Sequence, residues 1–172
     1  MCSSDLITLG GVNDTPVLDV VSGATVTDTA ADDTYADITG TLTGSDLDAG
    51  DVVGFELAGS SASIETGFDV QKSSDYGTFY LNSTSGAYKF VVNDAAVEAL
   101  KTSQTAAFVV NATDGTADSV AQTITITLGG VNDTPVAVAD TGIAREKSGI
   151  NNGTPGFDAT GGVLANDTDR DA

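Results

Sequence analysis

Hydrophobic and polar residues alternate over short stretches of this chain, and Gly, Asn, Asp and Ser separate the stretches. Alternation with a period of two, in segments rich in Val, Thr and aromatic residues, is typical of β-strands with one buried face. The pattern predicts strands at residues 17–21, 24–27, 36–43, 52–57, 62–65, 77–81, 87–92, 106–112 and 119–128.

Large side chains stand at alternate positions of these strands, as in two sheets packed face to face. We expect the bulk of the core to come from Tyr80, Tyr88, Phe90, Phe108 and Val110. Residues 93–101 differ, because the capping residue Asn93 precedes good helix formers and a basic end. The sequence therefore predicts an all-β, two-sheet sandwich with one short helix that crosses between the sheets.

Eleven residues occur twice without change: Ile-Thr-Leu-Gly-Gly-Val-Asn-Asp-Thr-Pro-Val stands at 7–17 and again at 126–136. The spacing is about the length of one domain, which indicates a tandem array. Each copy joins the end of a strand to a Gly pair, an Asn-Asp pair and a Thr-Pro that favours extended backbone. We expect it to link one domain to the next.

This repetition predicts the domain organisation. Residues 13–131 are expected to be one complete repeat, and residues 132–172 the linker and opening of a following, truncated repeat in which 148–162 is a loop. Residues 1–12 are expected to be an adapter-derived leader plus the last strand of a preceding repeat. The opening hexapeptide fits no strand pattern, holds the single Cys, and is encoded in frame by the sequencing-adapter sequence GTG-TGC-TCT-TCC-GAT-CT. Without that Cys no disulfide is available.

The net charge of the chain limits the classes of partner that it can bind. The formal net charge is −19, with 25 acidic residues against six Lys and Arg, and only Glu56, Glu65, Glu98 and Glu146 among the acids are not Asp. Such a charge argues against nucleic acid or an anionic membrane as a partner. No apolar stretch is long enough to span a bilayer, so we expect no membrane insertion. Asp favours turns and binds hard cations, so a divalent cation is the more natural counter-charge.

Candidate cation ligands fall in three acidic clusters. Calcium takes six to eight oxygen ligands, and three loops at one end of a sandwich can supply them together. Two aspartates two residues apart also point to the same side of an extended segment. The alternative is that these residues simply populate turns. The clusters are Asn13 and Asp14, repeated as Asn132 and Asp133; Asp46 and Asp48, echoed by Asp169 and Asp171; and Asp114 with Asp118.

Other chemistries fit less well. An EF-hand loop starting at Asp46 would need Glu at its twelfth position, where the chain has Leu57, and the Gly-rich nonapeptide of calcium-binding β-rolls does not recur. The chain has no His and, outside the leader, no Cys, which excludes Ser-His-Asp and Cys-His sites and the usual zinc sites. A glycosidase-type carboxylate pair stays open, without an aromatic stripe beside it. We expect no enzymatic activity.

Several motifs of the chain resemble those of a known family of repeats. Ala112-Thr113-Asp114-Gly115, the following Thr-Ile-Thr-Ile-Thr strand and Val131-Asn132-Asp133-Thr134-Pro135 resemble the closing part of cadherin-type repeats. The run from Gly77-Thr78-Phe79 through Ser85-Gly86-Ala87-Tyr88 to the linker is more closely similar to the VCBS and cadherin-like repeats of very large bacterial adhesins of the RTX type. The resemblance covers nearly all of residues 7–172.

The resemblance implies an immunoglobulin-like or cadherin-like sandwich that binds Ca2+ and is repeated many times in an extracellular protein of the bacterial cell surface. It places Asn13, Asp46, Asp48 and Asp114 in one interdomain calcium site, and Asn132, Asp169 and Asp171 at the start of the next. The chain departs from the cadherin pattern, since Gly11 and Gly130 replace a linker Asp and the Leu-Asp-Arg-Glu segment is missing. One or two ions per junction are therefore expected instead of three.

The leading functional hypothesis is a calcium-stiffened extender in an adhesin that acts in cell adhesion or biofilm formation. Its partners would be neighbouring repeats of the same polypeptide, or identical chains, together with calcium. A second hypothesis is a carbohydrate- or protein-binding module, which exposed aromatic residues clustered on one face would favour. A third is a subunit of a calcium-stabilised extracellular filament, in which neighbouring chains complete the strand at 7–11 and the tail from Asn132.

Overall fold

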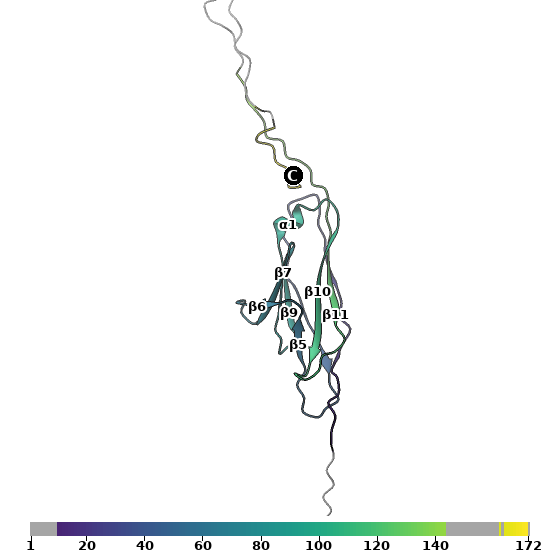
Figure 1. Cartoon of the computed structure of the whole chain (residues 1–172). Helices are drawn as coiled ribbons and strands as arrows, with labels where there is room; N and C mark the ends of the chain where they lie inside the picture. Colours follow the sequence, from purple (N-terminus) through teal and green to yellow (C-terminus); the bar gives the residue numbers. More distant parts are fainter. Residues whose placement is uncertain (1–9, 144–161, 163, 172) are drawn as a thin grey trace, which may run out of the picture.

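The computed structural model describes residues 10–143, 162 and 164–171. In this part the chain forms an elongated β-sandwich with one short helix at one end (Figure 1), so the predicted fold class is confirmed. Most of the predicted strand at 7–11 and most of the predicted loop at 148–162 lie outside the described residues.

Two sheets make up the sandwich. The first has the order β2 (Ala24–Val26), β11 (Gln122–Leu128), β10 (Gln104–Thr113) and β5 (Gly54–Leu57). Its pairs are antiparallel except β2 with β11, which is parallel. The second is antiparallel throughout and has the order β3 (Ile38–Thr41), β9 (Ala87–Val92), β8 (Gly77–Leu81), β7 (Val70–Ser74) and β6 (Ser61–Ala62). A further small sheet pairs β1 (Val17–Leu18) with β4 (Gly44–Ser45).

The helix α1 (Asp94–Glu98) follows β9 of the second sheet and precedes β10 of the first, so it crosses between the sheets as predicted. It is shorter than the predicted range of 93–101. Asn93 occupies the N-cap position without making a side-chain capping hydrogen bond, and no basic residue lies in the last turn. We call the end of the sandwich that carries α1 the helix pole, and the opposite end, which carries residues 46–51, the loop pole (Figure 1).

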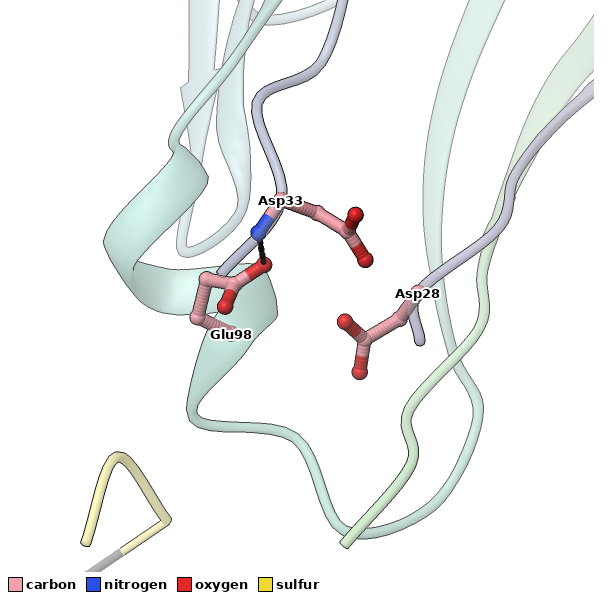
Figure 2. A group of neighbouring side chains, drawn as sticks. All are labelled: Asp28, Asp33 and Glu98. Atoms are coloured by element: carbon pink, nitrogen blue, oxygen red, sulfur yellow. Dashed lines mark hydrogen bonds between the residues drawn. The ribbon is translucent and has the colours of Figure 1, made fainter. Parts of the chain in front are cut away.

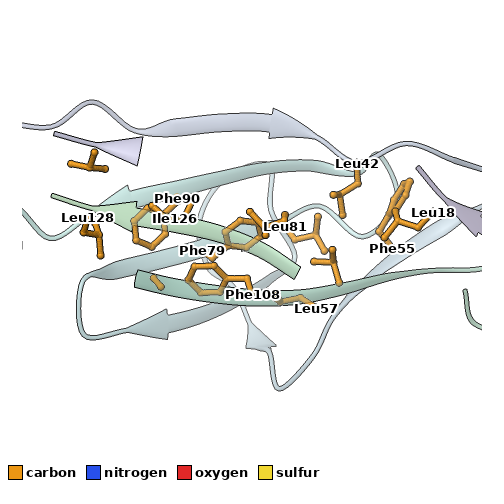
Figure 3. Close-up of a cluster of buried hydrophobic side chains, with 14 of the residues drawn as sticks. Leu18, Leu42, Phe55, Leu57, Phe79, Leu81, Phe90, Phe108, Ile126 and Leu128 are labelled. Atoms are coloured by element: carbon orange, nitrogen blue, oxygen red, sulfur yellow. The ribbon is translucent and has the colours of Figure 1, made fainter. Parts of the chain in front are cut away.

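The core lies between the two sheets (Figure 3). Phe79, Phe90 and Phe108 are almost completely buried, and the ring centroids of Phe79 and Phe108 lie 4.7 Å apart. Buried aromatic and aliphatic side chains of this size supply most of the driving force for folding. All buried hydrophobic residues of the described chain lie between Leu18 and Leu128. The unit of residues 13–131 therefore contains a complete core of its own.

The prediction that Tyr80 belongs to the core is wrong. In β8 the side chains of Phe79 and Leu81 are buried, and Tyr80 points to the outer face. There its ring centroid lies 6.0 Å from that of Phe68, and Lys89 Nζ lies 5.5 Å from both centroids. Adjacent aromatic residues leave the phase of the alternation open, and a shift of one residue exchanges the two faces of a strand.

Several strand boundaries also differ from the prediction. The predicted strand at 36–43 is shorter in the structure, where β3 ends at Thr41. The next residue, Leu42, is buried, and β4 begins at Gly44. The predicted strand at 62–65 is replaced by β6, which lies earlier in the chain. The strand β7 was not predicted, because Gln-Lys-Ser-Ser is too polar to indicate a strand. The segment is nevertheless a strand, because it pairs with β8 over five residue pairs.

Candidate functional site

At the loop pole, the segments 13–18 and 44–48, which we call the N-terminal segments, lie side by side through the pairing of β1 with β4. Asn13 Nδ2 donates a hydrogen bond of 2.9 Å to Asp114 Oδ2. The Asp14 amide donates one of 2.6 Å to Asp48 Oδ2, and the Asp48 amide donates one of 2.7 Å to Asp46 Oδ1. The fold thus brings together five of the six residues predicted at this pole, whereas the sixth, Asp118, is exposed and forms a backbone bridge with Thr113.

Within this group the carboxylates differ in what they offer a cation. Oxygens of Asp46, Asp48 and Asp51 lie within 4.8 Å of one another. Asp46 Oδ2 is buried and has no hydrogen-bond partner among the described residues. Asp14 contributes its amide to the group, and its side chain is exposed. The arrangement leaves Asp46, Asp48 and Asp51 as the carboxylates best placed to share an ion.

Asp114 makes three hydrogen bonds that organise this pole. Its Oδ1 accepts hydrogen bonds from the amides of Thr116 and Ala117 at 2.6 and 2.7 Å, and its Oδ2 accepts the bond from Asn13. The amide of Ala117, the side chain of Asn13 and the amide of Thr116 together hold the pKa of Asp114 below its usual value. Asp114 therefore caps the turn before β11 and ties that turn to the linker.

Residues 132–138 and 164–171, which we call the C-terminal segments, repeat the geometry of the N-terminal segments beside the helix pole. The Asp133 amide donates to Asp171 Oδ2 at 2.6 Å, and the Asp171 amide donates to Asp169 Oδ1 at 3.0 Å. The Asn132 side chain donates to the carbonyl of Asp133 at 2.9 Å, as Asn13 does to that of Asp14 at 2.7 Å. Val136 bridges to Thr168 as Val17 pairs with Ser45. The two sets of segments are therefore structural copies.

The helix pole adds an acidic cluster that sequence reasoning missed. Asp28, which follows β2, Asp33, and Glu98 at the end of α1 place carboxylate oxygens within 4.8 Å of one another (Figure 2). The amide of Asp33 donates to Glu98 Oε1 at 3.1 Å, and the amide of Val131 donates to Asp28 Oδ2 at 2.8 Å. The sequence gives only a weak signal for this cluster, because Asp28 and Asp33 lie in the loop between β2 and β3 whereas Glu98 lies in α1, and only folding brings them together.

Tyr35 lies inside this cluster. Its hydroxyl is 2.8 Å from Asp28 Oδ1 and 2.8 Å from Glu98 Oε1. Burial and then hydrogen bonding to these two carboxylates raise the pKa of Tyr35. The phenol therefore stays protonated and donates its single proton to one carboxylate at a time.

Four carboxylate oxygens at the helix pole are buried without a hydrogen-bond partner in the described part of the chain: Glu98 Oε2, both oxygens of Asp133, and Asp171 Oδ1. Asp133 and Glu98 are each 4% exposed and Asp171 8%. Burial, and then the charges of Asp171, Glu98 and Asp28, raise the pKa of Asp133, whereas Arg170 acts in the opposite direction. Buried carboxylates of this kind are normally paired or bound to a metal.

The donor set fits a hard divalent cation. Asp133 is the equivalent of Asp14 in the identical linker, yet Asp14 is exposed and Asp133 is buried beside Glu98. Calcium binds through carboxylate and carbonyl oxygens and would add positive charge to that of Arg170, which lies 3.7 Å from Glu98 Oε2 and acts on Asp133. Among the described carboxylates of this pole, those with oxygens within 4.8 Å of one another are Asp28, Asp33 and Glu98, and the charges of Asp171, Glu98 and Asp28 act on Asp133 beside them.

Comparison with known proteins gives no further guidance: neither a protein-family model nor a curated protein matches the chain. Among the described residues, no helix has the length and apolar character needed to cross a membrane.

Proposed function

We propose that this chain is a calcium-binding spacer unit of a tandem array, whose task is to hold neighbouring units at a fixed angle and distance. The observation that carries the proposal is the set of buried oxygens of Glu98, Asp133 and Asp171 that have no hydrogen-bond partner within the described part of the chain. Glu98 belongs to the unit itself, whereas Asp133 and Asp171 belong to the C-terminal segments. A cation bound there joins two successive units.

The mechanism is electrostatic. Without a cation, the carboxylates at each junction repel one another and favour separation of the units, and the chain then bends in the linker after Val131, whose amide is bonded to Asp28 of the unit. With a cation, each carboxylate gains a ligand bond, and binding to the closed junction alone shifts the equilibrium toward it. The junction then becomes stiff. Extracellular calcium modules bind at about 10⁻⁴ to 10⁻³ M, so this change would occur outside the cell and not in the cytosol.

The wider setting is proposed from the resemblance to VCBS and cadherin-like repeats. It points to a large bacterial surface adhesin that acts in cell adhesion or biofilm formation, in which many such units carry a binding domain away from the cell. The strongly acidic composition and the exact repetition of the linker support this setting. The likeness between the N-terminal and C-terminal segments supports it too, because each set opens a unit in the same way.

Small-angle scattering on a two-unit protein tests the proposal. Two copies of residues 13–131 joined in tandem keep the natural linker sequence, because residues 7–17 and 126–136 are identical. In millimolar calcium we expect a rod with a narrow distribution of the maximum dimension, and in chelator a broader and shorter distribution. An unchanged distribution would remove the mechanism.

Magnesium at the same concentration is the matched ionic control. Mg²⁺ demands near-octahedral geometry and gives up its waters reluctantly, so it should stiffen the two-unit protein less than calcium does. Equal effects of the two ions would mean that general charge screening, and not a site, controls the junction.

A further inference from the structure

The two sets of segments differ at one informative position. Leu47 lies between Asp46 and Asp48, and Arg170 lies between Asp169 and Asp171, in the same hydrogen-bonded arrangement. Leu47 and Arg170 are therefore structural equivalents. At the helix pole, the residue at this position reaches from the C-terminal segments to the unit that precedes them.

The contacts of Arg170 show what this position does. Its Nη1 hydrogen-bonds to Asp32 Oδ1 and lies 3.7 Å from Glu98 Oε2. The same two surfaces enclose a cleft of about 270 Å³, lined on one side by Ala30, Ala31 and Asp32 and on the other by residues of the C-terminal segments that include Val136 and Arg170. Arg170 thus matches an acidic side chain on the preceding unit.

The identical linker sequences allow the burial at the two ends to be compared residue by residue. Val131 is 38% exposed, whereas its equivalent Val12 is 86% exposed. Asp133 is buried against the unit, whereas Asp14 is exposed. Leu47 is 87% exposed. The surface that a preceding unit covers at the helix pole is therefore open at the loop pole, and there it carries a leucine instead of an arginine.

We infer that the residue between the two aspartates of the opening segments selects which unit can precede them. Arg170 selects a preceding unit that has an acidic residue at the position of Asp32. Leu47 takes a unit with an apolar residue at that position, so the partner of the loop pole is a unit unlike this one in its 30–32 loop. This inference rests on the proposed tandem arrangement and adds to it an order of the units.

The physical reason lies in desolvation. A leucine beside Asp32, whose side chain is 65% exposed even next to Arg170, would cover part of the carboxylate without giving it a partner, and Glu98 would lose its neighbouring guanidinium. An arginine packed on an apolar loop would likewise bury an uncompensated charge. Each mismatched pair is disfavoured, and discrimination of this kind comes from the penalty on the wrong partner.

The chain as it exists provides the first test. In calcium, Arg170→Leu should speed hydrogen exchange of the Asp133 amide, which is buried at the junction, by about two- to fivefold, the range expected of an exposed ion pair. Adding Asp32→Leu should reverse most of this change, because the pair is then apolar on both sides and only the weaker contact of Arg170 with Glu98 at 3.7 Å stays lost. Lys101→Leu, which removes an exposed positive charge near the same pole, is the control and should change nothing. An Arg170→Leu effect that is absent, or that Asp32→Leu does not reverse, would overturn the inference.

The two-unit protein provides the second test, because it places Leu47 of the second copy on Asp32 of the first. Leu47→Arg in the second copy, or Asp32→Leu in the first, should each raise the ratio of closed to open junctions about two- to fivefold, as measured by the distance between spin labels on the two units. The two changes together should cancel. Additive effects, or none, would contradict the inference. If calcium also fails to close every variant, the proposed function fails with it; if calcium closes all variants equally, only the inference fails.

Discussion

The substitution Glu98→Gln should raise the stability of the protein relative to the wild type without calcium, and lower it relative to the wild type with calcium. Glu98 Oε1 accepts hydrogen bonds from the Asp33 amide and the Tyr35 hydroxyl, and a glutamine oxygen can accept both. The amide group of the glutamine would then replace Oε2, which has no hydrogen-bond partner among the described residues and only the exposed Arg170 guanidinium at 3.7 Å as an ionic neighbour there. The substitution removes one charge from a crowded acidic cluster and introduces a donor beside Asp133. Without calcium, the variant should therefore be more stable than the wild type.

With calcium the order should be the opposite, and the size of the effect follows from binding linkage. One ion with a dissociation constant of ~10⁻⁴ to 10⁻³ M stabilises the closed form by about 1.4 to 2.7 kcal/mol at about 10 mM free calcium. Unfolding about 120 residues carries an entropy of ~0.25 kcal/mol/K, so the wild type should gain ~6 to 11 °C in Tm. Glu98→Gln should lose most of this gain, because a neutral amide is a weaker calcium ligand than a carboxylate.

Scanning calorimetry of both proteins in excess calcium and in excess chelator measures these four values of Tm. Asp75→Asn is the matched control, since it removes one acidic charge from an exposed turn between β7 and β8. It should leave the calcium response unchanged. The reasoning fails if Glu98→Gln keeps the full calcium response, or if calcium does not change the Tm of the wild type.

The remaining predictions concern the stability of the sandwich. Burial raises the pKa of Asp69, but the hydrogen bonds that Ser83 donates to it outweigh burial and hold the pKa below its usual value. Asp69→Ala should cost about 1 kcal/mol in urea unfolding at pH 7. That cost should shrink as the pH falls below about 4, because the carboxylate stabilises the fold only while ionised. Phe108→Ala should cost about 3 to 5 kcal/mol in the same assay, and a loss under 1 kcal/mol would contradict the assigned core. Gly86→Ala should lower Tm more than Gly50→Ala: both have positive φ, but only at Gly86 would a Cβ meet a backbone oxygen, that of Leu42 at 2.3 Å.

Local patterns in the sequence predicted much of the fold. The strands at 77–81 and 87–92 appear with the predicted boundaries, because β-branched and aromatic residues alternate there and glycines or turn residues limit them. The short helix is found because mostly good helix formers follow Asn93, with Val97 the one β-branched residue of α1. The acidic residues at the two linkers could also be named in advance, because they recur in a repeated segment.

What the sequence determined by itself was therefore local or repeated: the two-residue period of the strands, the helix and the duplicated linker. What only the tertiary structure decided was which residues meet. The face of β8 that carries Phe79 is chosen by packing against Phe108, and β7 becomes a strand because β8 pairs with it. Glu98 reaches the Asp133 linker because α1 ends at the same pole where β11 leaves the sandwich. Such contacts join positions far apart in the chain, and they depend on the order of strands in two sheets, for which a local pattern carries no signal.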